Sequence, residues 1–481
     1  MKLKKQFLSL SALLAMGVAT TAWAQSTCPS TDITFEDNVA SLEGDASSGY
    51  YVNMPKPSST FCHAVRTTVE IPDGVKTFKV YDDGGANGIF NPPLCGSDGC
   101  SINLKLVAPV EYNLRVTGSI ITNPDDNSAS GRYGFLYVFD ASVGGKVLHE
   151  YKGEDHSILD WTGNQMYLRF RSAHHDGTNR DGLDLTVHVL KKNEAESNAA
   201  IDIYDHGDGS AYKVAKIKDI ESGELSITTP MTVNAVEFER VFTKDVAATT
   251  VLPFSLPAGA TTNARFYTLK QVEAVDGKWV ATMQWIGSKA LPQANTPYVV
   301  VVKNGCEPDK DSYDGKSCHL KFSNYNSVTL QTGDIVKKFN PAETWYFTGT
   351  YAYRDWAVGD QVLGLAYGYA GPTEVEMYEG QFGRMGSGSS AAPMRAFLSK
   401  ANASVSLGRP LAKGEVSSIE DMPEVIDVEL VDEDEKPMAI GRLSTVTGAI
   451  KIDRWFDLKG RSTNHKPTTK GAFFNKKGIA K

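Results

Sequence analysis

The segments YNLRVTGSI (112–120), FLYVF (135–139), QMYLRF (165–170) and GLDLTVHVL (182–190) decide the fold. Apolar and polar residues alternate in each of them; in the last, Leu183, Leu185 and Val187 are separated by polar neighbours. Side chains of a β-strand point to opposite faces with a period of two, so each segment can bury one face and expose the other. Several such strands at short spacing predict an antiparallel β-sandwich.

The first 24 residues have the organisation of a secretory signal peptide. Three lysines at positions 2, 4 and 5 precede an uncharged, mostly apolar run over 7–20, and Ala22-Trp23-Ala24 fits the small-x-small cleavage pattern. We expect residues 1–24 to be removed and the exported chain to begin at Gln25. The apolar run is too short to span a bilayer comfortably, and no later stretch reads as a transmembrane segment.

Charge and length limit the class of protein. The full chain of 481 residues has a formal net charge of −8, and loss of the three signal-peptide lysines makes it −11. Nucleic acid is excluded as a partner because phosphate binding needs a basic surface. The length predicts two or more domains, and 43 glycines with 10% aromatic residues fit a β-rich chain.

The chain has an even number of cysteines after the signal peptide: Cys28, Cys62, Cys95, Cys100, Cys306 and Cys318. An even count in an exported chain predicts disulfides. Proximity suggests Cys95–Cys100 and Cys306–Cys318, which leaves Cys28–Cys62, although sequence alone does not prove this connectivity. A zinc site is not indicated, because the chain has no CxxC pair.

A set of motifs in the first part of the chain resembles the bacterial CUB-like domain, a jelly-roll sandwich of secreted modular proteins. They are YDDGG (81–85), LRVTG (114–118), FLYVFD (135–140), GNQM (163–166), LRFRS (168–172) and GL (182–183). We expect residues 25–192 to form this domain. Many CUB domains bind calcium, but Gly134 and Ala173 stand where that site has two of its acids. Calcium needs several oxygen ligands, so we expect no cofactor.

Two groups of residues in this domain are candidates for ligand binding. The loop around His174, His175 and Asp176 is either a solvated loop or a binding loop. Neighbouring side chains of an extended segment point opposite ways, so the two histidines are poorly placed to share one metal ion. Trp161, Tyr167 and Arg171 could form a flat surface for stacking a sugar, or Trp161 could pack at the sandwich edge.

A polar bridge over 191–198 separates a second β-rich domain, which we place at residues 193–400. Its motifs resemble an accessory β-sandwich domain that recurs in surface proteins of gliding and fibre-degrading Gram-negative bacteria. They are FERVFT (238–243), VLPFSL (251–256), ANTPY (294–298), WYFTGTY (345–351) and PMRAFL (393–398). That resemblance implies a spacer or adhesion module with no assigned chemistry.

Aromatic residues are dense between 345 and 369, and Tyr353 and Trp356 are our candidates for a binding surface there. The alternative is that these rings form the core and edge of the sandwich. The acidic loop between Cys306 and Cys318 has a D-x-D-x-x-D-G spacing without the glutamate that a calcium loop needs, so a surface loop closed by a disulfide is the simpler interpretation.

The charge of the chain changes sign near its end. Residues 401–440 read as an acidic linker, with ten acids against one lysine over 415–436, although alternating apolar residues such as Val425, Ile426 and Val428 leave room for a strand. The last 34 residues are basic. Within 441–481, WFDLKGR (455–461) and GAFF (471–474) resemble the C-terminal sorting domain of the type IX secretion route. We expect a small β-module that meets the secretion machinery, which agrees with the export signal.

The fold class predicted is therefore all-β, with two antiparallel sandwiches and a small C-terminal β-module. We interpret the chain as an exported, non-catalytic binding or adhesion protein at the cell surface, with plant polysaccharide or a surface protein as its partner. A glycoside-active enzyme on a jelly roll and a purely structural spacer are the alternatives. The enzyme needs two carboxylates about 5–10 Å apart in a cleft, and no sequence pattern selects such a pair.

Overall fold

The computed structural model describes the chain from residue 39 to residue 480 with internal gaps. The gaps are 55–64, 83–99, 122–134, 140–146, 153, 173–181, 208–211, 276, 304–316, 359–362, 371–379, 402–421, 434–436, 440–441, 444–449, 452–454, 458–461, 464–472 and 476–477. Every regular element in the described part is a β-strand, which confirms the all-β prediction. Within that part, no helix could cross a membrane.

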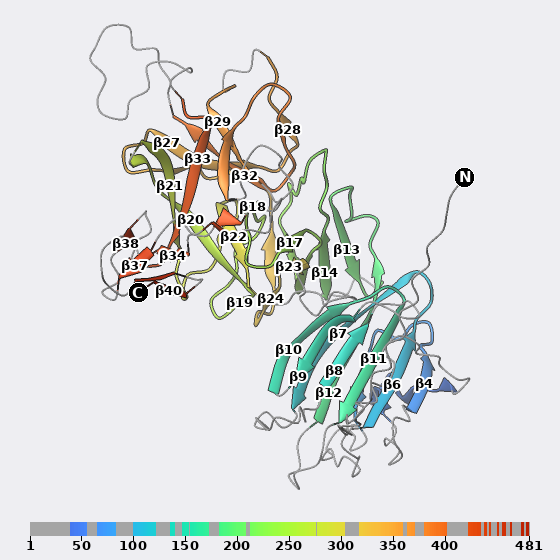
Figure 1. The fold of residues 1–481 in the computed structure, drawn as a ribbon. Helices are drawn as coiled ribbons and strands as arrows, with labels where there is room; N and C mark the ends of the chain where they lie inside the picture. Colours follow the sequence, from blue (N-terminus) through green and yellow to red (C-terminus); the bar gives the residue numbers. More distant parts are fainter. Residues whose placement is uncertain are drawn as a thin grey trace, which may run out of the picture.

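The first domain is a sandwich of two sheets (Figure 1). The six-stranded sheet has the order β1 (Val39–Ala40), β4 (Val65–Glu70), β6 (Cys100–Val107), β11 (Gln165–Ser172), β8 (Phe135–Phe139), β9 (Val147–Lys152). The facing sheet contains β2 (Glu43–Asp45), β3 (Gly49–Asn53), β5 (Thr77–Tyr81), β12 (Gly182–Lys192), β7 (Tyr112–Ile121) and β10 (Glu154–Trp161). The apolar sides of the alternating strands meet between them: Leu104, Leu114, Leu168 and Leu185 are almost completely buried there.

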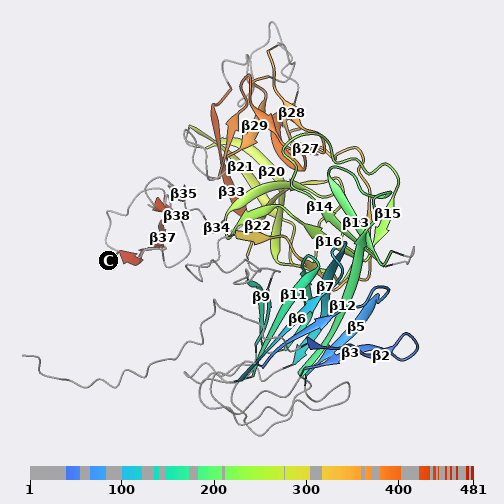
Figure 2. The same ribbon diagram turned by 90° about the vertical axis from the view of Figure 1, so that its right-hand side faces the viewer.

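The facing sheet continues into the second domain. The end of β12 pairs with β13 (Ile201–Asp205), which pairs with β14 (Lys213–Ile217) and then with β16 (Ala235–Phe238). All five residues of β13 are buried. Its two faces pack in different clusters, because Ile201 and Ile203 join the large core of the second domain while Tyr204 packs with Leu190. One sheet therefore passes through both domains, as Figure 2 shows from the side.

The second domain is built on an eleven-stranded sheet. Its order is β18 (Ala247–Val251), β22 (Pro297–Val302), β20 (Ala264–Val275), β21 (Lys278–Trp285), β33 (Val425–Val431), β30 (Gln381–Arg384), β29 (Ala366–Tyr369), β32 (Arg395–Lys400), β27 (Trp345–Thr350) and β26 (Lys338–Phe339), with β34 (Pro437–Ala439) beside β33. All six residues of β22 are buried, as its continuous apolar sequence predicts for a strand covered on both faces.

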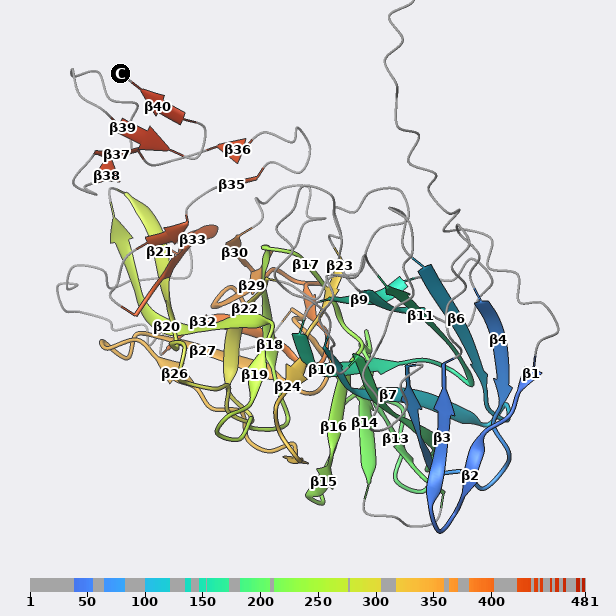
Figure 3. The same cartoon turned by 90° about the horizontal axis from the view of Figure 1, so that it is seen from below.

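Short two-stranded ladders close the rest of this domain. They are β15 (Met231–Val233) with β25 (Val328–Leu330), β17 (Val241–Thr243) with β23 (Ser317–His319), β19 (Thr261–Thr262) with β24 (Phe322–Ser323) and β28 (Arg354–Asp355) with β31 (Ser390–Ala391). Toward the end of the chain, β35 (Arg442–Leu443) pairs with β36 (Ile450–Lys451), and a separate sheet has the order β38 (Ser462–Thr463), β37 (Trp455–Asp457), β39 (Phe473–Asn475), β40 (Gly478–Ala480) (Figure 3).

Two predictions about this architecture need correction. The sheets are mixed rather than purely antiparallel, because β4 runs parallel to β6, β3 to β5, β14 to β16 and β21 to β33. The segment predicted as an acidic linker also contributes β33, which lies between β21 and β30 in the large sheet. Ile426 is fully buried there, so the apolar residues of this acidic stretch belong to the second domain.

Candidate functional site

Three neighbouring strands of the shared sheet place a row of polar and aromatic side chains toward the second domain. Arg115 on β7 lies opposite Trp161 on β10 and opposite His188 on β12. Directly opposed residues of adjacent strands project on the same face of a sheet. The row is therefore set by strand register, and it occupies the end of the first domain from which β12 continues into β13.

Each member of this row has a partner from the second domain. Trp161 packs against Tyr204 with ring centroids 4.8 Å apart at 69°, and His188 stacks on Tyr212 with centroids 4.2 Å apart at 2°. The Arg115 Nη1 group donates to the Glu237 carboxylate. The aromatic contacts and the ion pair of the buried Arg115 join the two domains in addition to the shared sheet.

Arg115 is the most deeply buried charge of this junction, with a relative exposure of 2%. Burial is the largest single effect and lowers the pKa of its guanidinium. The Glu237 carboxylate, Tyr212 and Tyr325 together outweigh this effect, so the pKa is raised. The Arg115 Nε–H group has no hydrogen-bond partner among the described residues. The guanidinium therefore binds Glu237 and Tyr212, and its Nε–H group is left without a partner in this part of the chain.

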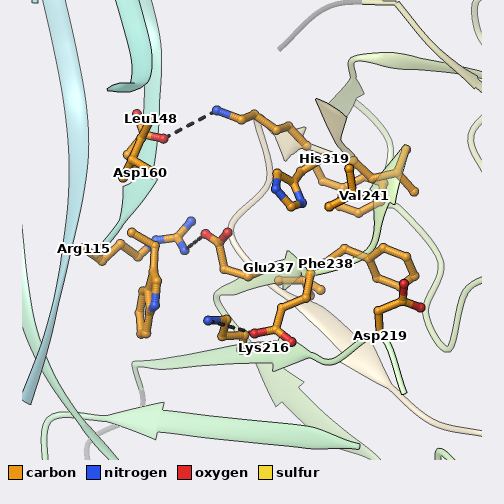
Figure 4. A pocket seen from close by; sticks show the side chains of 15 residues that line it. Arg115, Leu148, Asp160, Lys216, Asp219, Glu237, Phe238, Val241 and His319 are labelled. Atoms are coloured by element: carbon orange, nitrogen blue, oxygen red, sulfur yellow. Dashed lines mark hydrogen bonds and ion pairs between the residues drawn. The ribbon is translucent and has the colours of Figure 1, made fainter. Parts of the chain in front are cut away.

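Beside this row the two domains enclose a recess of about 540 Å³. Figure 4 shows Arg115 and Asp160 on the side of the first domain, with Lys216, Glu237 and His319 on the side of the second. Trp161 also lines the recess, and its apolar wall is formed by Leu148, Val236, Phe238, Val241, Leu320 and Phe322. This volume lies within the range of roughly 300–1,000 Å³ that is typical of small-molecule sites.

The carboxylates of the recess are engaged with cations. Asp160 is 3.5 Å from Lys321 Nζ and also accepts a hydrogen bond from the Tyr151 hydroxyl, and Glu239 is 2.9 Å from Lys216 Nζ. Asp219 binds Arg395 at 2.8 Å, and Glu237 binds Arg115. This arrangement suits a polar binding surface with fixed donors and acceptors better than a pair of carboxylates that act as acid and nucleophile. Among the described residues, no group of three or more histidine, cysteine, aspartate or glutamate side chains could hold a metal ion.

The structure separates the predicted sugar-stacking residues of the first domain. Trp161 is half-buried and lines the recess, whereas Tyr167 is 5% exposed and packs with Phe139 in another cluster. Arg171 lies on β11, opposite Ser101 and Phe135. These three residues therefore do not combine into one flat surface centred on Trp161 and Tyr167, because β10 and β11 belong to different sheets.

In the second domain, one of the two predicted aromatic residues is accessible. Tyr353 is 43% exposed, but Trp356 is completely buried and packs edge-on against Phe397 with centroids 5.3 Å apart. Trp356 therefore cannot present a ring face to a ligand. His174, His175 and Asp176 lie outside the described residues, as do Gly134 and Ala173, so the expectations about the histidine loop and about calcium stay predictions.

The disulfide pattern also stays a prediction. Cys318 is fully buried and disulfide-bonded, and Cys100 begins β6. Cys28, Cys62, Cys95 and Cys306 lie outside the described residues.

Sequence reasoning missed the residues that form the junction: Arg115, His188, Tyr212 and Glu237. Arg115 and His188 occupy the polar positions of alternating strands, where a solvent-facing side chain is the ordinary expectation. Their role becomes visible only from the residues that they contact, and Arg115 and Glu237 are more than 100 residues apart in the sequence. Local sequence patterns do not contain that information.

No protein-family model and no curated protein matches this chain. Two solved structures with some similarity are the CUB1-EGF-CUB2 domains of rat MASP-1 and the CUB1-EGF-CUB2 domain of human MASP-1/3. The first is 10% identical, with a TM-score of 0.21 over 55% of this chain and 100% of that chain. The second is 11% identical, with a TM-score of 0.20 over 52% of this chain and 99% of that chain. Likenesses at this level carry no argument about the fold or the function of this chain.

Proposed function

We propose that this chain is an exported, non-catalytic binding or adhesion protein and that its ligand, a plant polysaccharide, binds in the recess between the two domains. The observation that carries the proposal is the recess itself, in which the half-buried Trp161 lies beside ion pairs of fixed geometry. Carbohydrate sites combine an apolar ring surface with polar side chains that hydrogen-bond to hydroxyl groups.

The rigid connection of the domains supports this assignment. Both domains contribute walls of the recess, and the shared sheet with the Arg115–Glu237 pair holds those walls in place without a ligand. A preformed site avoids much of the entropic cost of ordering on binding. The signal peptide and the sorting-like tail at 441–481 complete the proposal, since they would deliver such a protein to the cell exterior.

Native gels that contain soluble polysaccharides test the proposal. Migration of the full chain should be slowed by at least one of hydroxyethyl cellulose, xylan and galactomannan, and Trp161→Ala should weaken this binding about tenfold or more, a loss of ~1.4 kcal/mol. Tyr353→Ala is the matched control, because this exposed aromatic residue lies outside the recess. Its binding should equal that of the unmodified chain.

Two outcomes would contradict the proposal. Unchanged migration in all of these gels, together with no retention on insoluble cellulose, would remove the polysaccharide. Release of reducing sugar that disappears in Asp160→Asn or Glu237→Gln would establish a glycoside-active enzyme instead, because both carboxylates face this recess.

A further inference from the structure

Arg115, which lines the recess, has one buried hydrogen-bond donor without a partner in the part of the chain that the structure describes. The Arg115 side chain is 2% exposed, and its Nε–H group has no partner among the described residues. A buried donor without a partner costs about 1–3 kcal/mol, and more when the group is charged. Most buried polar groups in proteins are paired with protein or with water, so this guanidinium, which lines the recess, suits an acceptor oxygen that is not part of this chain.

The charged side chains around Arg115 are paired with opposite charges of the same chain. Arg115 pairs with Glu237, Lys321 with Asp160, and Lys216 with Glu239. The remaining acid of the lining, Asp219, pairs with Arg395. An added charge of either sign would meet a like charge in one of these pairs. A neutral hydroxyl group both donates and accepts, so it can bind between the partners of an ion pair without this repulsion.

The shape of the recess limits how much of a ligand it can hold. Strands of the first domain form one wall, and β16, β17 and the segment 319–322 form the others. The volume of about 540 Å³ accommodates a few sugar rings rather than the repeating surface of a fibre. Trp356 and Tyr167, the rings that could have formed a flat platform elsewhere, are buried.

We propose that the recess binds the end of a neutral glycan chain, in which a sugar hydroxyl oxygen accepts from the Arg115 guanidinium and a neighbouring hydroxyl donates to the Glu237 carboxylate. This inference rests on the proposed function and specifies the part of the polysaccharide that is recognised. The Arg115–Glu237 pair then has two roles, since it joins the domains and selects the ligand.

Titration calorimetry on the full chain tests the chain-end binding. The probes are the neutral tri- and hexasaccharides of β-1,4-linked glucose, xylose and mannose, with the trimer of galacturonic acid as the acidic counterpart. At least one neutral trisaccharide should bind, and its hexasaccharide should bind within about threefold of the same affinity, because only the end enters the recess. Trigalacturonate should bind at least tenfold more weakly.

The outcomes separate this inference from the proposed function. An affinity that rises more than tenfold from trimer to hexamer would show a chain lying along a groove, and tighter binding of trigalacturonate would show an anion site; either result overturns the inference alone. Retention of a polymer without binding of any oligosaccharide overturns it as well. If neither polymer nor oligosaccharide binds, the proposed function fails too.

Variants test the two residues directly. The double substitution Arg115→Gln with Glu237→Gln removes both charges together, so no buried charge is left unpaired. It should weaken trisaccharide binding at least tenfold with an unchanged near-ultraviolet circular dichroism spectrum. The matched control is Lys218→Gln with Asp202→Asn, which removes a 2.9 Å ion pair outside the recess together with the 3.2 Å contact between Asp202 and Lys192. This control should bind like the unmodified chain.

Unchanged affinity in a folded double variant would overturn the inference. If that variant does not fold, Glu237→Asp provides the second measurement, because it keeps the negative charge but withdraws the carboxylate by one methylene. Trisaccharide affinity should then fall at least threefold. Unchanged affinity in Glu237→Asp would also overturn the inference.

Discussion

The two domains are both β-structures, but they bury different kinds of side chain. The core of the first domain is mainly aliphatic, with Leu104, Leu106, Leu114 and Val116 fully buried. In the core of the second, Trp345 lies 5.5 Å from Tyr367 and 5.8 Å from Trp279, and other aromatic residues pack in the same way. Aromatic density along the second half of the sequence therefore marks a core, whereas the polar recess lies where the domains meet.

This difference predicts where a large truncation is most damaging, and Trp345→Ala tests it with the largest expected effect. Trp345 is 1% exposed, so its removal should lower the free energy of unfolding of the second domain by about 3–5 kcal/mol. Urea unfolding followed by circular dichroism measures the change. Its neighbour Tyr346 projects to the opposite face of β27 and is half-buried, so Tyr346→Ala is the matched control and should cost clearly less. Equal losses would contradict the aromatic-core interpretation.

In the first domain, the position most sensitive to substitution is a glycine at which two strand backbones approach closely, and no aromatic ring is involved. Gly118 on β7 has φ +132°, and a Cβ atom there would collide with the backbone of Asp184 and Leu185 on β12. Gly118→Ala should therefore destabilise the chain by about 2–3 kcal/mol, measured by the same urea titration. Gly163→Ala is the control, because nothing lies within 4 Å of its added Cβ. A Gly118→Ala loss as small as that of the control would mean that the strands can separate without cost.

Much of the first domain was predictable because its strands follow a single rule. Residues alternate on 112–120 and 182–190, and β7 and β12 pair along these segments with the apolar side in the core. The buried run 298–302 likewise predicts β22. Strand order and parallel pairing were not predictable, because the partner of a strand such as β33 is set by the topology of the whole chain and not by its own residues.

The candidate site was predictable in one residue. Trp161 was identified as an aromatic candidate, and it lines the recess. Trp356 was misassigned because the burial of a ring depends on the strands that cover it, which alternation does not reveal. Arg115 and Glu237 form a pair although β7 and β16 are not neighbours in the shared sheet, because the junction of the two domains brings the two side chains together. A site between two domains cannot be predicted from the sequence pattern of either domain alone.

The junction should differ from both cores in its response to pH, and His188 makes this measurable. Burial, followed by the charges of His206, Arg115 and Lys79, lowers the pKa of His188 from 6.5 to about 3. Between these values the unfolded chain binds a proton that the folded chain does not, so this contribution to stability is complete above about pH 6.5 and is lost as the pH falls toward 3. At pH 4.5 the loss relative to pH 7 should be about 2.5 kcal/mol.

His188→Phe isolates this effect, because phenylalanine can still stack on Tyr212 but cannot ionise. The difference in unfolding free energy between pH 7 and pH 4.5, measured by urea titration, should be about 2.5 kcal/mol smaller in this variant than in the unmodified chain. Thr117→Val is the control, since it removes the 3.2 Å contact with His188 Nε2 and a 3.4 Å hydrogen bond to the Thr186 carbonyl but no titratable group, and it should keep most of the pH dependence. An identical pH dependence in His188→Phe would show that His188 does not titrate between the two states.

The smallest expected effect is at an ion pair on the exposed face of the first domain, and it sharpens the contrast with the junction. Lys79 Nζ is 2.7 Å from Asp184 Oδ1, close to the separation in a buried pair, but both side chains are more than 40% exposed. Water and salt screen such pairs, so Lys79→Gln should change the unfolding free energy by less than about 0.5 kcal/mol. Glu237→Gln, which strips a 2% exposed arginine of its counterion, should cost several times more. Equal losses of unfolding free energy for the two substitutions in parallel urea titrations would show that burial does not strengthen the ion pair of Arg115.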